Sequence, residues 1–257
     1  MLTLHLPSNN LPERQYSAEV LLGEILGLPL ILKFHDESHS RIELENGHQL
    51  TIEDHFFNSF LQEKSYLHEE SLPSDVSWVK KADNPFIPED NLPVIFGNDN
   101  LVISKKHIHC GVDVFASAFY MLSRWEEYVS GAKDEHGRFP AKASLAARQG
   151  FMQRPVVNEY AEMLSNMLSY LGCTSSRRQP EPRAIVTHDV DIPLLWPTLA
   201  FFLKKLTGDL LKRRSFREAL FSIRSFFTTI LKLGKDPYDT FDRLMTLSEQ
   251  HGFQSHF

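Results

Sequence analysis

The stretch "RAIVTHDVDIP", Arg183 to Pro193, decides how the carboxyl-terminal part of the chain is interpreted. Its apolar run Ala184 to Val186 predicts a strand, and polar or acidic residues follow at once: Thr187, His188, Asp189 and Asp191. Side chains alternate along an extended strand, so Thr187, Asp189 and Asp191 would share one face, with their Cα atoms ~6.6 Å apart in succession. Two carboxylates at that spacing can act on one water, one holding a divalent metal and the other removing a proton. The alternative is an acidic turn that ends an ordinary strand.

Upstream of this strand, the segment "CTSSRRQPEP" (173–182) contains small and charged residues and two prolines, which is typical of a linker. We therefore expect an amino-terminal domain over residues 1–172, a linker over 173–182 and a second domain over 183–257. Strands and helices alternate in the first part, which predicts a small mixed α/β domain.

Within residues 1–172 the pattern predicts several elements. Helices are expected at 12–26, 53–63, 113–130 and 155–171, with Asp113 as an N-cap and Gly172 as a stop. A buried strand is expected at 28–34, and a hairpin at 42–52 with Asn46-Gly47 in a type I′ turn. A short strand is expected at 92–97, closed by the turn "GNDN" (97–100).

Downstream of the decisive stretch, residues 197–233 are expected to be mostly helical. A further helix is expected over 236–252, capped by Asp236 and closed by Gly252. "FQSHF" (253–257) resembles the opening of another strand.

Composition limits the function classes. The chain has 257 residues, of which 42% are hydrophobic, and a formal net charge of −6, which argues against a general nucleic-acid binder. Two cysteines are too few for a disulfide framework and fit a reducing compartment. The amino terminus lacks the features of a signal peptide, and the longest apolar runs are shorter than the ~20 residues of a membrane span. We therefore expect a cytoplasmic protein.

The charge is distributed unevenly. Residues 196–235 carry nine Lys or Arg against Asp209 and Glu218, a local +7, so the remainder of the chain carries −13. The part of this segment at 203–235 is also rich in Phe and Leu and could contact a membrane surface as an amphipathic helix pair. Phenylalanines on more than one side of the expected helices favour instead an insertion packed against the acidic amino-terminal domain.

The stretch "AIVTHDVD" resembles the first motif of the polysaccharide deacetylase family, also called carbohydrate esterase family 4 or the NodB homology domain. The stretches "FASAFYMLSRWEEYV", "DEHGRFPAKASLA" and "RPVVNEYAEML" resemble the amino-terminal domain that precedes such a deacetylase in some bacterial proteins. The resemblance implies a distorted (β/α) barrel that hydrolyses acetyl groups on sugars or polysaccharides, so we expect residues 183–257 to be the first part of this barrel.

The resemblance also implies roles for single residues. Asp189 becomes the base that activates water, Asp191 a ligand of a divalent metal, usually zinc, and Thr187 and His188 their supporting neighbours. The family places its two aspartates side by side, whereas Val190 separates them here. The family's paired metal-binding histidines are also missing, because His251 and His256 are five residues apart. We therefore expect an incomplete barrel, truncated early and inactive by itself.

Other residues of the sequence are candidates for functional sites. His107 and His109 would share a strand face beside Cys110 and could coordinate a metal. Glu126 and Glu127 are adjacent on a helix, which favours a surface role over catalysis.

His136 and Arg138 lie in "DEHGRFP", which is most simply a turn, and either could touch a sugar or a neighbouring domain.

At the level of the whole chain, two interpretations compete with the deacetylase. One is a non-enzymatic carbohydrate-binding or scaffold module in which residues 1–172 do the work. The other is a different D-x-D enzyme, either a metal-dependent glycosyltransferase or a phosphatase that uses the first Asp as nucleophile. No glycine-rich loop supports a glycosyltransferase, and Pro193 and the leucines after it do not fit a phosphatase.

Overall fold

The computed structural model describes residues 2–62, 64–175, 177–178 and 181–257 and divides the chain into two compact units, Met1–Gln179 and Pro180–Phe257. The boundary falls within the segment expected as a linker, of which residues 176, 179 and 180 lie outside the described part. Each unit is described by itself.

The first unit is built on a six-stranded mixed sheet with the strand order β2-β1-β3-β4-β8-β7. Its strands are β1 (Leu2–Pro7), β2 (Leu30–His35), β3 (His39–Glu43), β4 (Gln49–Glu53), β7 (Gly97–Ile103) and β8 (His107–Val112). β1 pairs with β2, and β4 with β8, in parallel, whereas the other pairs are antiparallel. A separate antiparallel pair is formed by β5 (Ser77–Lys80) and β6 (Asn91–Val94).

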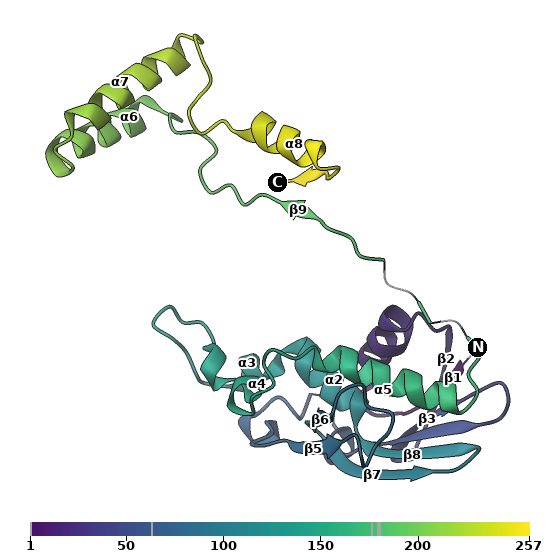
Figure 1. The fold of residues 1–257 in the computed structure, drawn as a ribbon. Coiled ribbons are helices and arrows are strands. Elements are labelled where there is room, and N and C mark those ends of the chain that lie inside the picture. The colour runs from purple at the N-terminus through teal and green to yellow at the C-terminus, as the bar shows by residue number, and fades with distance from the viewer. Residues whose placement is uncertain (1, 63, 176, 179–180) are drawn as a thin grey trace. The chain divides into compact units, whose positions relative to one another are not determined.

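Helices pack against one face of this sheet (Figure 1). They are α1 (Leu11–Ala18) with its π-helical continuation Glu19–Ile25, α2 (Val114–Ser123), α3 (Trp125–Val129), α4 (Leu145–Arg148) and α5 (Val156–Tyr170). Alternation along β1 shows which face they cover: Leu2, Leu4 and Leu6 are buried, whereas Thr3 and His5 between them are half-buried. The expected mixed α/β architecture is thus confirmed for this unit.

Several expected elements are present where glycine or proline marks their ends. The helix expected at 12–26 ends before Gly27, which has a φ of 70°. The helix expected at 155–171 is α5, followed by Gly172 at a φ of 84°. The hairpin is formed by β3 and β4, but its turn is not type I′, because only Gly47 has a positive φ and the loop closes from Leu44 to His48.

Other expectations were wrong, each for a tertiary reason. The strand at 28–34 is not buried, because β2 lies at the sheet edge and leaves Phe34 46% exposed. The helix at 53–63 is reduced to the 3₁₀ turn Phe57–Ser59, since the Asp54 carboxylate accepts the Phe57 N–H. "GNDN" is not a turn but an irregular part of β7. The helix at 113–130 breaks into α2 and α3 at Arg124, whose φ is 56°.

The second unit contains β9 (Val186–Thr187), α6 (Leu199–Thr207) with its π-helical continuation Gly208–Lys212, α7 (Phe216–Ile230), α8 (Phe241–Gln250) and β10 (Ser255–His256). β9 and β10 form a two-stranded parallel sheet. Residues 183–257 were expected to be the first part of a barrel, and this parallel pair does not by itself confirm a barrel. A small separate core contains Leu195, Trp196, Phe202 and Phe226.

The last helix begins five residues later than expected. Asp236 is not its N-cap, because its carboxylate accepts the backbone N–H groups of Leu195 and Trp196 at 2.8 and 2.9 Å. Helix α8 starts at Phe241 instead. Within the described part of the chain, no helix has the length and apolar character needed to cross a membrane.

Candidate functional site

The D-x-D segment follows the carboxyl end of β9. The strand ends at Thr187, so Asp189 and Asp191 lie beyond it, and the expectation that they share a strand face with Thr187 is wrong. The strand is short because its ladder to β10 ends with the bond from the His188 N–H to the His256 carbonyl, at 2.8 Å. Both aspartates are exposed, and neither carboxylate has a hydrogen bond to any other described residue.

His188 is held by the far end of the same unit. Its Nε2 lies 3.2 Å from Oγ of Ser255 and 3.5 Å from Oγ of Ser248, and its ring stacks on Phe257 with centroids 5.1 Å apart. The imidazole therefore links β9 to α8 and β10 and does not contact the aspartates. These contacts explain how residues about seventy positions apart fix the end of β9, which Asp189 and Asp191 follow.

The residues present do not complete a metal site. Across the described ranges, no group of three His, Cys, Asp or Glu side chains could hold a metal ion. A catalytic zinc takes three protein ligands, and Asp191 alone cannot supply them. The divalent metal implied by the deacetylase resemblance therefore does not fit the second unit as it stands, whereas two exposed carboxylates after a parallel strand remain available to accept protons or hydrogen bonds.

A second polar cluster lies in the first unit, on β4 and β8. One carboxylate oxygen of Glu53 lies 2.6 Å from Nε2 of His109, and the other lies 2.5 Å from Nε2 of His55. Burial raises the pKa of Glu53, but the hydrogen bonds to His109 and His55 outweigh it and leave the pKa below its usual value. Sequence reasoning missed Glu53 and His55, because only the parallel register of β4 and β8 brings them to His109.

The candidates at 107–110 do not converge. His107 and His109 share a face, as expected for a strand, but His107 contacts Thr51 and His109 contacts Glu53. Cys110 is fully buried on the opposite face, and burial raises the pKa of its thiol to about 12. A joint metal site of the two histidines with this cysteine is therefore not formed.

The remaining candidates are structural. Glu126 is not a surface residue: it is buried and accepts the Leu145 N–H at 2.7 Å, and burial raises its pKa. Glu127 forms an ion pair with Arg124. His136 and Arg138 lie in the turn that was expected, with both backbone N–H groups donating to the Asp134 carboxylate.

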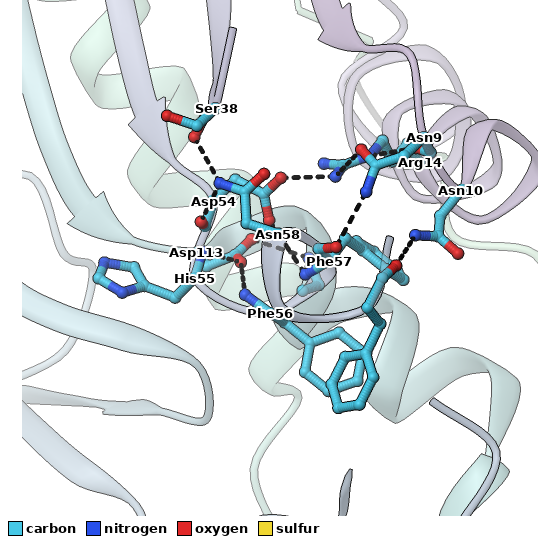
Figure 2. Close-up of polar contacts among 12 residues, drawn as sticks. Asn9, Asn10, Arg14, Ser38, Asp54, His55, Phe56, Phe57, Asn58 and Asp113 are labelled. Carbon is cyan, nitrogen blue, oxygen red and sulfur yellow. Dashed lines mark hydrogen bonds and ion pairs between the residues drawn. The ribbon is translucent and has the colours of Figure 1, made fainter. Parts of the chain in front are cut away.

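A hollow of about 500 Å³ lies where the parallel strands β1 and β2 end. Its lining includes Ser8, Asn9, Asn10, Asp36, Ser38 and Asn58. Beneath this hollow, buried Arg14 donates to Asp54 and to both oxygens of Asn9, as Figure 2 shows in part. Because Asp54 neutralises Arg14, the hollow presents amides, hydroxyls and carboxylates, which suits a hydroxyl-bearing ligand better than an anion.

Comparison with known proteins identifies a family. The model of a family of unknown function, DUF7033, matches residues 2–172, which include the sheet and helices α1 to α5. No curated protein and no solved structure matches the chain. The matched range ends at Gly172, where the amino-terminal domain was expected to end.

Proposed function

The chain belongs to the DUF7033 family, and from this premise we propose that it is part of a deacetylase that removes acetyl groups from sugars. The DUF7033 unit is its accessory domain, and the second unit contributes the opening β-α-β part of the hydrolase. One observation supports this most: β9 and β10 are parallel neighbours joined through helices, and Asp189 and Asp191 follow the carboxyl end of β9. Ligand sites of α/β folds gather at such strand ends.

In this proposal Asp189 is the base that takes a proton from the attacking water, and its exposure leaves the carboxylate free to do so. Asp191 would supply one oxygen ligand to a divalent metal, and the other ligands would have to come from residues other than those described. Zinc polarises the acetyl carbonyl in the enzymes that the motif resembles. The 257-residue chain alone is therefore expected to release no acetate from acetylated chitin oligosaccharides.

The first experiment reads the encoding DNA beyond the codon for Phe257. We expect a strand followed by two histidines about four residues apart within the next few hundred bases. The longer chain is then expressed and assayed for acetate release, with Asp189→Asn as the test variant and Asp239→Asn as a matched control at a half-buried aspartate of the same unit. Loss in the first variant alone supports the proposal, whereas release that survives both Asp189→Asn and Asp191→Asn overturns it.

A second candidate function, carbohydrate binding, concerns the first unit, because the hollow beside β1 and β2 is lined by amides, hydroxyls and carboxylates, which can bind sugar hydroxyls. Asn58 borders the hollow, and its side-chain amide donates to the Ser38 and Asp54 backbone carbonyls. Titration with chitin and xylan oligosaccharides, followed by calorimetry, tests this function. Binding that Asp36→Ala weakens would support it, and no heat with either sugar would rule out these two ligands.

A further inference from the structure

Helices α6 and α7 of the second unit form a hairpin with its own small core. The rings of Phe202 and Phe226 stack with centroids 3.9 Å apart, and the Trp196 indole N–H donates to Ser225. At the turn, buried Asp209 accepts hydrogen bonds from Lys205, Arg213 and Ser222. The hairpin is therefore a defined structure and not a pair of unattached helices (Figure 1).

Helix α7 carries a second apolar stripe that its core contacts do not use. The stripe repeats every three or four residues and its members are 38–84% exposed: Phe216, Leu220, Ile223, Phe227 and Ile230. At 3.6 residues per turn these positions fall on one face of the helix. The face that contacts α6 is different, since it contains buried Ala219, Ser222 and Phe226.

Helix α6 extends this apolar face. Leu199 and Leu203 are 60% and 51% exposed, one turn apart, while Phe202 points to the core. Viewed down each helix from its amino end, the centre of the exposed stripe lies roughly 80° from the core residue, which is Phe202 in α6 and Phe226 in α7. In both helices this rotation follows the direction in which the chain winds. Because the two helices of a hairpin run antiparallel, the same sense places both stripes on the same side of the hairpin.

Cations border this face and carboxylates do not. Along α7, Arg217 and Arg224 fall beside the stripe, and at the turn the chain carries Lys212 and Arg214, whereas Arg213 is paired with Asp209. The acidic residues of this segment point elsewhere. Asp209 is buried, and Glu218 lies on α7 about half a turn away from Phe216 and the rest of the stripe.

We propose that the α6–α7 hairpin binds the surface of a membrane that contains anionic phospholipids. The apolar stripes would enter the boundary between headgroups and acyl chains, and the flanking Lys and Arg side chains would reach the phosphates. The position of the charges favours lipid over a second copy paired through the same face, because such pairing would set the rim cations against each other, whereas a plane of negative headgroups matches them. Phe201 and Phe221 lie off the stripes and are not part of the contact.

The test is flotation of the purified chain with phosphatidylcholine vesicles that contain none or 30% phosphatidylglycerol. We expect the protein to float with the anionic vesicles at 0.1 M salt and to remain at the bottom with the neutral ones. The double variant Arg217→Glu/Arg224→Glu should lower the partition coefficient about tenfold or more, since each basic residue near the surface adds measurably to binding. Lys105→Glu/Lys106→Glu, which makes the same charge change in an exposed loop of the first unit, should leave partition unchanged.

A second pair of variants separates the apolar contribution from the charge. Phe216→Ser on the stripe should weaken flotation, whereas Phe221→Ser, which removes an exposed phenylalanine off the stripe, should not. Both side chains are exposed, so neither change should unfold the hairpin, which circular dichroism checks. Equal flotation of the two variants overturns the proposal. So does failure to float together with a concentration-dependent dimer in light scattering, which would assign the face to a second copy.

Discussion

Nη2 of Arg14 lies 2.5 Å from Oδ2 of Asp54, and both side chains are 2% exposed. The pair joins helix α1 to the segment after β4, forty residues further along the chain. Arg14 also lies over the ring of Phe57, with its guanidinium carbon 4.9 Å from the ring centroid. The ion pair thus links two elements that enclose the hollow at the end of β1.

Replacing Asp54 by Asn should destabilise the first unit strongly. The change keeps the shape of the side chain but leaves Arg14 as a buried cation without its counter-charge, which costs about 3–5 kcal/mol in the free energy of unfolding. Urea denaturation followed by circular dichroism measures this. The control is Glu127→Gln in the exposed pair with Arg124, which should cost less than about 1 kcal/mol. Equal losses in the two variants would contradict the special role of the buried pair.

The stability of this unit should also depend on pH through Asp113. Its carboxylate is 3% exposed, burial raises its pKa to about 6, and the charge of Asp54 acts in the same direction. Between pH 3.8 and 6 the folded state therefore holds a proton that the unfolded state has lost. The free energy of unfolding due to this group falls as pH rises through that window, by up to about 3 kcal/mol, and is constant above it.

The measurement compares the native chain with Asp113→Asn by urea denaturation at several pH values from 4 to 7. Asparagine cannot ionise, so the difference in unfolding free energy between the two proteins isolates the titration of Asp113. We expect the native chain to lose stability relative to the variant as pH rises from 4 to 6. Loss of hydrogen bonds to His55, Phe56 and Ala116 adds a constant offset. A difference that is flat with pH would refute the raised pKa.

Local signals in the sequence predicted the elements that they alone determine. Pro155 and Gly172 bracket α5 because proline tolerates a first helical turn and glycine accepts the positive φ after the last one. Asp113 caps α2 by accepting the Ala116 N–H, as its type and position indicated. These contacts span only a few residues, so a short stretch of sequence contains both partners.

The sites depend on distant partners and were predicted less well. The D-x-D motif was located, but the end of β9 is set by β10 nearly seventy residues later, and no local pattern reveals where that ladder stops. Glu53 and His109 meet because β4 and β8 are parallel neighbours, although 56 residues separate them. The local sequence indicates Asp236 as a helix cap, but its carboxylate accepts the N–H groups of Leu195 and Trp196, 41 and 40 residues upstream, as well as that of nearby Tyr238.

That role of Asp236 can be tested in the second unit. Asp236→Ala removes the acceptor of two buried backbone N–H groups, and leaving buried donors unpaired costs about 1–3 kcal/mol each. We expect faster hydrogen exchange at Leu195 and Trp196 and a red shift of Trp196 fluorescence in a chain whose other tryptophans, Trp78 and Trp125, are replaced by Phe. Asp239→Ala, at a neighbouring aspartate, should leave exchange at these amides unchanged. If it accelerates exchange as much as Asp236→Ala does, the assignment is wrong.

The sharpest steric prediction concerns Gly97 at the start of β7. Its φ is 100°, and a Cβ atom there would lie 2.2 Å from the Gly111 carbonyl oxygen and 2.6 Å from the Asp113 backbone nitrogen. Both obstacles are backbone atoms of β8 and of the cap of α2, so neither can move aside as a flexible side chain could. Gly47 in the hairpin turn makes the matched control, because its φ is 78° but nothing lies within 4 Å of its Cβ position.

We therefore expect Gly47→Ala to cost only the left-handed backbone term, about 1–2 kcal/mol in the free energy of unfolding. Gly97→Ala carries that cost and must also push β7 away from β8, so it should lose at least ~2 kcal/mol more. Urea denaturation of the two variants under one condition compares them directly. Equal losses would show that the close approach of β7 to Gly111 is not maintained in solution. A larger loss in Gly97→Ala, accompanied by a weaker pH dependence of stability, would show that the same contact positions Asp113 over the first turn of α2.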